Sequence, residues 1–367
     1  MLAGPALENL IAAIAESCRS GVDPETLRAA VLPRLRRAVP FDALWWATVD
    51  PATLLFTRAY TQEIPDDAGP YFVENEFLAE DVNKWTRLAR DAVGVRTLME
   101  ATDGRPRDSP RYRDIFQPLG LEDELRAVLR TRGVSWGYLC LHRQSGSPFT
   151  VEERRLIGRV APHLAEGIRL GVLLGAAASA EAADAPGVIL LGSDASAVTA
   201  NAAAERWLDE LRAPSATEAL PIEVHALRTQ LRHLGSREAA APRVTVLTRR
   251  GRWATLCATW LPVNGELEVA VIIQPATTTD TAPLVMRAYG LTAQERNVAE
   301  AVCRGLSTRE IALRLRITSN TLQDHLKVIF DKTGVRSRRE LTATILRQQY
   351  LPRAKANSPL DAAGGFR

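Results

Sequence analysis

The chain has 367 residues, 46% of them hydrophobic, and 46 Lys and Arg against 43 Asp and Glu give a net charge of +3. This length favours two or three domains, and this composition is typical of globular proteins with hydrophobic cores of ordinary size. The four cysteines are Cys18, Cys140, Cys257 and Cys303, and they are too widely scattered for a structural zinc site or a disulfide scaffold.

No segment has the pattern of an export signal or of a membrane span. The N-terminus lacks a basic region followed by a long apolar run. The most apolar run begins at Gly171 and is broken by Glu181, well short of the roughly 20 residues that a membrane-spanning helix requires. We therefore expect a cytoplasmic protein with no membrane partner.

The first segment, residues 1–175, predicts an antiparallel sheet with helices. Two helical patterns, LENLIAAIAESC and PETLRAAVLPRLRRAV, precede two strand-like runs, FDALWWATVD and TLLFTRAYT, with Asp50 and Pro51 at the turn between them. A helical, aromatic-rich middle separates these from two further strands, LRAVLRT and WGYLCLHR. A long helix closes the segment, and Thr150 and Glu153 have the spacing of a capping box at its start.

This order of elements, with the ending SPFTVEERRLIGRVAPHLAEGIR, resembles the GAF sensor domain. The resemblance rests on the pattern of elements and not on one invariant motif. It implies an α+β domain that binds a small molecule or only mediates dimerisation.

The next segment, residues 186–275, follows the small and polar run GAAASAEAADAP. The run GVILLGSDASAVTANAAAERWLDEL predicts a strand, a turn, a strand and a helix, and three more strands follow in RVTVLTRRGRWATLCATWLP and LEVAVIIQPAT. Two strands, helices and three strands resemble a PAS domain, and Asn201 leads into a helix as it does at that family's second-strand exit. The run PATTTDTAP, residues 275–283, is typical of a linker, and we expect the linker at residues 276–284.

Positive charge is concentrated near the C-terminus. Residues 284–353 contain 13 Lys and Arg against 6 Asp and Glu, a balance of +7, and residues 354–367 add +1, so that the preceding residues carry −5. An acidic body with a small basic domain is the asymmetry expected of a sensor attached to a nucleic-acid binder. Residues 353–367 are expected to form a disordered tail.

Residues 285–352 predict a domain of four short helices, at about 293–304, 308–315, 319–332 and 338–349. Three capping boxes mark helix starts, at Thr292 with Glu295, Ser307 with Glu310 and Ser337 with Glu340. Thr318 is a fourth N-cap, and Gly305 and Gly334 stand where helices must end. The second and third helices are separated by only a few residues, which is the spacing of a helix-turn-helix.

The third helix of this domain, within ITSNTLQDHLKVIF, has two different faces. One face is apolar and consists of Leu322, Leu326, Ile329 and Phe330. The opposite face consists of Asn320, Gln323, Asp324, Lys327 and Asp331. These polar side chains can hydrogen-bond to base edges, but a solvated helix would serve fold stability equally well. The helical pattern alone leaves both interpretations open.

The string LTAQERNVAEAVCRGLSTREIALRLRITSNTLQDHLKVIFDKTGVRSRRELTATILRQQ closely resembles the LuxR-type (GerE-like) DNA-binding domain. The matched positions are Leu291, Thr292, Glu295, Gly305, Ser307, Glu310, Ile311, Ala312, Leu315, Ile317, Thr321, His325, Lys327, Ile329, Lys332, Val335 and Arg338. Three departures stand out: Gln294 replaces the usual arginine, Thr318 replaces serine, and Leu322-Gln323 replaces Val-Lys. The last departure removes a cation from the DNA face.

This resemblance implies roles for individual residues. Base contacts are implied for Gln323, Asp324 and Lys327, which would face the major groove. Phosphate contacts are implied for Thr321, His325, Lys332 and Arg338. Glutamine suits adenine, lysine suits guanine, and a carboxylate can accept only from cytosine N4. For His325 packing between helices is the alternative role, and for Thr321 it is a hydrogen bond within its own helix.

The fourth helix often mediates dimerisation in this family. Here Leu341, Ile345 and Leu346 form an apolar stripe, although packing onto the domain's own core would also explain it. A homodimer would place two recognition helices about 34 Å apart and predict an inverted-repeat site in double-stranded DNA.

No catalytic motif is present in the sequence, and the five histidines do not cluster in it. We therefore expect no enzymatic activity, no cofactor and no metal. The first segment instead gathers aromatic and polar side chains that a ligand pocket would use. These candidates are Trp45, Phe56, Tyr60, Trp85, Trp136, Tyr138 and His142. Alternation along SWGYLCLHR places Trp136, Tyr138, Cys140 and His142 on one face, and a packed core is the alternative.

These patterns predict a cytoplasmic, homodimeric, one-component transcription regulator of the LuxR type. Its fold class is multidomain α+β followed by an all-α domain, its partners are double-stranded DNA and RNA polymerase, and its N-terminal domains sense an unidentified small molecule or mediate dimerisation. Two alternatives remain. One is an interaction regulator whose helix-turn-helix contacts protein, which the low lysine content of the polar face favours. The other is a metabolite-binding enzyme with an appended DNA-binding domain.

Overall fold

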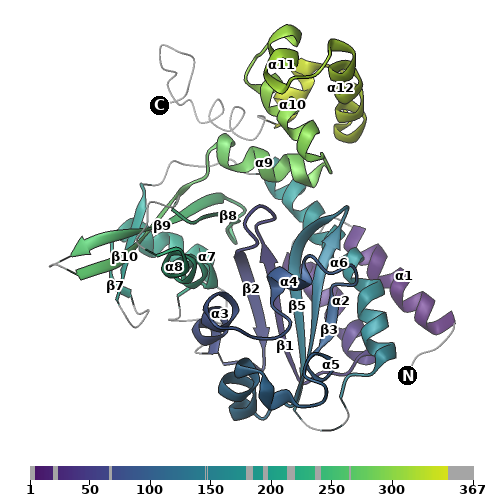
Figure 1. Ribbon diagram of the computed structural model, residues 1–367, viewed down its shortest axis with the longest axis vertical. Coiled ribbons are helices and arrows are strands. Elements are labelled where there is room, and N and C mark those ends of the chain that lie inside the picture. The colour runs from purple at the N-terminus through teal and green to yellow at the C-terminus, as the bar shows by residue number, and fades with distance from the viewer. Residues whose placement is uncertain are drawn as a thin grey trace. The chain divides into compact units, whose positions relative to one another are not determined.

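The computed structural model describes residues 5–19, 24–65, 68–144, 146, 148–178, 185–192, 197–212, 220–235, 241–263 and 266–345. Its contacts divide the chain into two units. The first unit consists of residues 1–171, 185–246 and 255–274, and it contains two antiparallel sheets (Figure 1). The second consists of residues 172–184, 247–254 and 275–367, and it contains the C-terminal helices.

The first sheet has the strand order β2-β1-β5-β4-β3. Its strands are β1 (Ala43–Val49), β2 (Phe56–Gln62), β3 (Val95–Thr97), β4 (Asp123–Thr131) and β5 (Val134–Arg143). The four strands predicted from the sequence are present, and β3 is an additional short strand in the segment predicted to be helical. Trp45 pairs with Cys140 and Ala47 with Tyr138, so these four side chains share one face of the sheet.

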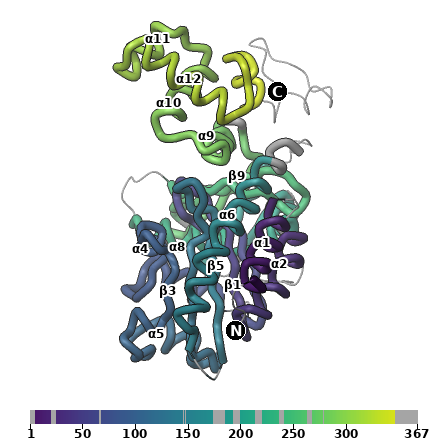
Figure 2. The backbone as a smooth tube through the Cα atoms, turned by 90° about the vertical axis from the view of Figure 1, so that its right-hand side faces the viewer, coloured from purple at the N-terminus to yellow at the C-terminus, as the bar shows by residue number. Residues whose placement is uncertain are grey.

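Helices cover both faces of this sheet. On one face lie α1 (Pro5–Arg19), α2 (Pro24–Ala38) and α6 (Val151–Ala178), which Figure 2 shows side by side. They pack so closely that a Cβ atom on Gly167 of α6 would come within 2.8 Å of the Leu27 side chain. The predicted capping box starts α6, because the Glu153 amide donates to Thr150 Oγ1 at 3.2 Å and the Thr150 amide donates to the Glu153 carboxylate at 2.8 Å.

The other face of the first sheet is covered by short helices from the aromatic-rich middle. These are α3 (Ala68–Leu78), α4 (Trp85–Leu88), α5 (Leu98–Ala101), the 3-10 turns Pro106–Asp108 and Gln117–Leu119, and the π-helical turn Tyr112–Phe116. Their apolar side chains join those of β1 and β5 in one buried cluster that includes Phe72, Trp85 and Phe116. This cluster is the main core on that face.

The second sheet has the order β7-β6-β10-β9-β8. Its elements are β6 (Gly187–Leu191), β7 (Ala197–Ala200), α7 (Ala202–Leu211), α8 (Ile222–Leu234), β8 (Arg243–Leu247), β9 (Trp253–Val263) and β10 (Glu266–Pro275). This matches the predicted series of two strands, helices and three strands. As expected, Asn201 caps α7, because its Oδ1 accepts from the Ala204 amide at 2.8 Å.

Helix α8 packs against α3 and β2 of the first sheet's layer, although it follows β6 and β7 in the chain. Ala226 is fully buried in the first sheet's core cluster, and Ile222 packs against that cluster. Glu74 of α3 pairs with Arg228 at 3.4 Å and with Arg232 at 3.3 Å. The two sheet-containing regions therefore share a core across α8.

The second unit contains α9 (Thr278–Ala288), α10 (Ala293–Cys303), α11 (Thr308–Leu315), α12 (Ser319–Thr333) and a helical stretch at 338–345. The last four agree with the predicted helices as far as the description extends. Leu322, Leu326 and Ile329 lie in the unit's buried cluster together with Ile311 and Leu341. Within the described residues, no helix is long and apolar enough to cross a membrane.

The segment predicted as a linker, residues 276–284, is mostly helical. Thr277 caps α9, since its side chain accepts from the Asp280 amide while the Asp280 carboxylate accepts from the Thr277 amide. The run was predicted as a linker because a threonine-rich composition next to a proline is typical of loops. Its capping pair was not recognised in the sequence. Leu346 and the predicted tail, residues 353–367, lie outside the described residues.

Candidate nucleic-acid interface and ligand cavity

Side-chain caps fix the ends of the helices that make the helix-turn-helix. Ser307 starts α11 with the predicted capping box, and its amide donates to Glu310 at 2.7 Å. Arg316 ends α11 in the left-handed conformation, at φ +54°. Thr318 then caps α12 by accepting from the Thr321 amide at 3.1 Å. The turn between the two helices is therefore very short, and it fixes how α12 leaves α11.

The capping box predicted at Ser337 and Glu340 forms only in part. The Glu340 amide donates to Ser337 Oγ at 3.1 Å, as predicted. The Glu340 carboxylate, however, accepts from the Arg336 amide at 2.8 Å. The side chain therefore satisfies an amide one residue earlier than a capping box would.

Helix α12 presents the two faces that its sequence predicts. Leu322, Leu326 and Ile329 are buried, and Phe330 is half-buried. The other face is exposed and consists of Asn320, Gln323, Asp324, Lys327 and Asp331. In the described part of the chain, Gln323, Asp324 and Lys327 have no hydrogen bond or ion pair. The three residues implied to contact bases thus lie together and are available to a partner.

The four residues implied to contact phosphates have more varied surroundings. Thr321 and His325 are half-buried on α12. Arg338 donates to Thr308 Oγ1 at 3.0 Å and so connects the fourth helix to the start of α11. Lys332 donates to the Glu295 carboxylate at 2.6 Å and so connects α12 to α10. Both cations therefore already hold the domain together.

The Lys332–Glu295 pair is partly shielded from solvent. Burial alone would raise the pKa of Glu295, but the Lys332 ammonium and the Thr292 amide hold that pKa below its usual value. Glu295 also closes the capping box of α10. One carboxylate therefore serves the start of α10 and the end of α12 at once.

The two described residues of the fourth helix's apolar stripe, Leu341 and Ile345, are not available as a dimerisation surface. Leu341 and Ile345 are both 0% exposed and belong to the core cluster of their own domain. Packing onto that core, the alternative role, accounts for both residues.

Four of the seven predicted pocket residues are packed against one another in the first sheet's core. The rings of Trp85 and Tyr138 stack at a centroid distance of 4.3 Å, and those of Trp45 and Phe56 meet edge to face at 5.0 Å. Both pairs belong to the same buried cluster. For Phe56, Trp85 and Tyr138 the packed-core interpretation therefore describes the structure.

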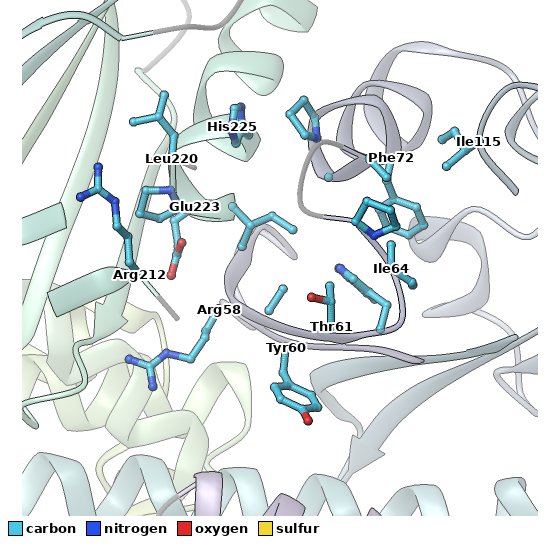
Figure 3. A pocket seen from close by; sticks show the side chains of 18 of the residues that line it. Arg58, Tyr60, Thr61, Ile64, Phe72, Ile115, Arg212, Leu220, Glu223 and His225 are labelled. Carbon is cyan, nitrogen blue, oxygen red and sulfur yellow. The ribbon is translucent and has the colours of Figure 1, made fainter. Parts of the chain in front are cut away.

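Trp136 and Tyr60 lie away from this cluster. Trp136 is buried but is not part of the cluster, and it has no partner on β4, because the pairing of β5 with β4 shifts between Ser135 and Gly137. Simple alternation along the strand does not extend across such a bulge to Trp136. Tyr60 is part of the lining of the cavity described below, but its ring points away from that space (Figure 3), and the Arg28 guanidinium lies 4.8 Å from the ring centre.

A buried network of charges, which was not predicted from the sequence, underlies the cluster. Glu124 of β4 accepts from Arg111 at 2.7 Å and from Arg126 at 2.9 Å. Arg126 also pairs with Glu76 at 2.9 Å, and Arg111 with Asp81 at 3.3 Å. Despite burial, the two guanidiniums hold the pKa of Glu124 well below its usual value. Alternating charged residues in the run DELRAVLRT were the available signal.

His142 lies beside this network. Its ring is 1% exposed, and neither ring nitrogen has a hydrogen-bond partner among the described residues. Burial, reinforced by nearby arginines, lowers the pKa of His142 to about 4, so the ring is neutral at pH 7. Candidate ligand atoms of Glu124, Cys140 and His142 lie within 4.8 Å of one another. The guanidiniums on Glu124 oppose a metal cation there.

One cavity of about 110 Å³ lies between β2, α3 and the start of α8 (Figure 3). Its apolar walls include Trp45, Phe72 and Phe116, and its polar lining includes His142 and Glu223. Glu223 is 1% exposed, and its Oε1 atom has no hydrogen-bond partner among the described residues. Burial raises the pKa of Glu223 to about 7. The sequence pointed to Trp45, Tyr60 and His142, which line this cavity, but nothing local identified Glu223.

Residues 290–345 match the family described as bacterial regulatory proteins, luxR family. The C-terminal part of this chain is a LuxR-type helix-turn-helix domain. Over 61 residues the chain is 39% identical to a probable HTH-type transcriptional regulator, GfsR, of Streptomyces halstedii. The match covers 17% of this chain and 24% of that relative, so the chain spans about a quarter of its length.

Solved structures show weaker likeness. Escherichia coli SdiA is 11% identical, with 93% of this chain and 98% of that chain covered and a TM-score of 0.32. A VqmA–ligand–DNA complex from Vibrio cholerae is 19% identical, with 45% of this chain and 82% of that chain covered and a TM-score of 0.23. At these scores neither likeness supports a conclusion about this chain.

Proposed function

We propose that this chain is a sequence-specific DNA-binding transcription regulator. The observation that carries the proposal is the exposed row of Gln323, Asp324 and Lys327 on α12, within a domain that matches the luxR family. The opposite face of α12 is held in the core, so this row is the face that can enter a major groove. The GAF-like and PAS-like regions then act as the sensing or dimerising part of a cytoplasmic, one-component regulator without enzymatic activity.

Each base-contacting residue has its own chemistry. Gln323 can bond to adenine N6 and N7, and Lys327 can donate to guanine O6 and N7. Asp324 can accept only from an amino group, such as cytosine N4, and it repels phosphate. Asp324 therefore lowers non-specific affinity while it penalises bases that present only acceptors.

Phosphate contacts would come from Thr321 and His325 at the edges of the base-reading face and from Arg338 near the start of α11. Lys332 is already in contact with Glu295 at 2.6 Å, so a phosphate would compete with Glu295 for its ammonium group. The excess of basic residues at 284–353 supplies the general attraction to DNA. Affinity should accordingly fall steeply as salt is added.

A homodimer with two-fold symmetry would bind an inverted repeat whose half-sites lie about 34 Å apart, as helix-turn-helix dimers do. Because Leu341 and Ile345 are buried in their own core, dimerisation would use other surfaces. RNA polymerase is the expected further partner of a regulator that activates.

Site selection from random duplexes, followed by titration of the preferred duplex, tests the proposal with the full chain. Lys327→Ala should weaken binding to that duplex by roughly 10-fold, since one base contact is worth about 1–3 kcal/mol. Arg105→Ala is the matched control, because it removes one cation from an exposed site in the first unit. If no sequence is enriched, or if both variants bind equally well, the proposal fails.

A second candidate has one specific observation in its favour. Leu313 of α11 is 81% exposed and Val328 of α12 is 40% exposed, and such apolar side chains can contact another protein. The helix-turn-helix would then be a protein-binding module. Leu313→Ser separates the two candidates, because it should weaken a protein complex and leave selected DNA sequences unchanged.

A further inference from the structure

The cavity beside the first sheet is built from two parts of the chain that are distant in sequence. Trp45 and Phe72 come from β1 and α3, whereas Ile222 and Glu223 come from the start of α8. Figure 3 shows Phe72 and Ile64 on one side and Glu223, Leu220 and His225 on the other. Closing this space therefore requires α8 to remain docked on the first sheet's layer.

Two buried polar groups of this cavity lack partners. Glu223 Oε1 has no hydrogen-bond partner in the described part of the chain, and neither ring nitrogen of His142 has one. Both side chains are 1% exposed, so bulk water does not replace the missing bonds. Leaving a buried donor or acceptor unpaired is costly, and a small molecule with suitable groups would remove that cost.

The charges around the cavity favour an uncharged molecule. Near His142, the guanidiniums of Arg111 and Arg126 oppose a cation. The carboxylates of Glu124, Glu76 and Asp81 already neutralise these guanidiniums, so they offer no net attraction to an anion. At the other end, Figure 3 shows the Arg58 and Arg212 side chains on the same side as Glu223. A cation would meet these arginines, and an anion would meet Glu223.

The size and walls of the cavity limit the molecule further. A cavity of comparable size, about 150 Å³, lined by apolar side chains is known to bind benzene. Here the volume is about 110 Å³, and Trp45, Phe72 and Phe116 supply aromatic walls. One ring with a short polar substituent fills such a space.

We propose that this cavity binds an uncharged molecule of about one aromatic ring that carries a hydroxyl or N–H group, with Glu223 and His142 as its hydrogen-bonding partners. This ligand site makes the sensing role of the proposed function more specific. Binding at the site does not depend on the proposed function, but any effect of the ligand on DNA binding does. Occupancy holds α8 against α3, where Glu74 already pairs with Arg228 and Arg232. Binding thereby strengthens the contact between the two sheet-containing regions.

The test uses four probes of one shape and measures binding to the full chain without DNA, by ligand-observed NMR and by tryptophan fluorescence. The probes are benzyl alcohol, toluene, benzylammonium and benzoate. Benzyl alcohol should bind about 10-fold more tightly than each of the other three. Because no DNA is present, a failure here is distinguishable from a failure of DNA binding.

Two glycine variants show where the probe binds. A Cβ atom on Gly69, which lines the cavity, would meet nothing within 4 Å, so Gly69→Leu can fill the space without disturbing α3. Gly171 of α6 is equally open and does not line the cavity, which makes Gly171→Leu the matched control. Gly69→Leu should weaken the binding of benzyl alcohol at least about 10-fold, and Gly171→Leu should leave its affinity unchanged.

Three results would overturn the proposal. They are the absence of binding by benzyl alcohol, equal binding by the two glycine variants, and tighter binding of either charged probe. Glu223→Gln adds a check on recognition, because it keeps the side-chain shape but replaces the carboxyl group. The variant should weaken the binding of benzyl alcohol several-fold and leave the affinity for toluene unchanged. Equal effects on both probes would show that Glu223 does not contact the ligand.

Discussion

At the scale of single residues, Asp324 is the most informative position on α12. Its carboxylate is exposed on the base-reading face and has no partner within the described residues. Asp324→Ala should strengthen non-specific DNA binding and remove roughly 1–3 kcal/mol of discrimination at one base pair. Site selection with the variant measures both changes. Asp331→Ala, which removes another exposed carboxylate of α12, should leave the preferred sequence unchanged. If Asp324→Ala also changes the base preference at no position, Asp324 reads no base.

Glu223 gives the first unit a pH dependence whose sign is fixed by its burial. The pKa of Glu223 rises from about 4.5 to about 7 on folding, so the unfolded chain ionises first as pH increases. Stability should therefore fall between pH 5 and pH 8, by at most about 3 kcal/mol. Glu223→Gln should be more stable than the wild type at pH 8 and lose that advantage at pH 5. Thermal melts at both pH values measure this, and a constant difference would contradict it.

At the scale of elements, the end of α11 contains a strained residue. Arg316 adopts φ +54°, a conformation that costs an L-amino acid roughly 1–2 kcal/mol and costs glycine almost nothing. Arg316→Gly should therefore be more stable than Arg316→Ala by about 0.5–1 kcal/mol, after allowance for the greater freedom of unfolded glycine. Denaturant unfolding of the two variants gives the difference. Both lose the same charge, so equal stabilities would show that the turn is unstrained.

Elements of the C-terminal domain were largely predictable from the sequence. The boxes at Thr292 and Ser307, the cap at Thr318 and the stop at Gly334 all form as their local spacing indicates. Such caps act within one turn of helix, so no distant contact is needed to define them. The failures have equally local causes: the Thr277–Asp280 cap of α9 was hidden in a loop-like composition, and the bulge beside Trp136 broke a simple alternation.

At the scale of the whole molecule, the two sheets share one strand order, in which the first strand lies between the second and the fifth. The two regions are nonetheless not independent, because α8 contributes Ala226 to the core of the first sheet. A change at the cavity therefore affects packing in both regions of the first unit. This shared core gives the sensing part a physical means to respond to a ligand.

The sequence by itself determined the helices of the C-terminal domain, the face of α12 that is exposed and the family that this domain matches. Those properties depend on short-range spacing and on a contiguous motif. Only the tertiary structure decided that Glu223 and His142, far apart in the chain, line one cavity, and that the core pairs Arg111 and Arg126 with the carboxylates of Glu124, Glu76 and Asp81. Such groupings arise from packing between distant segments, and the spacing of residues along one chain does not encode which distant partner each buried charge meets.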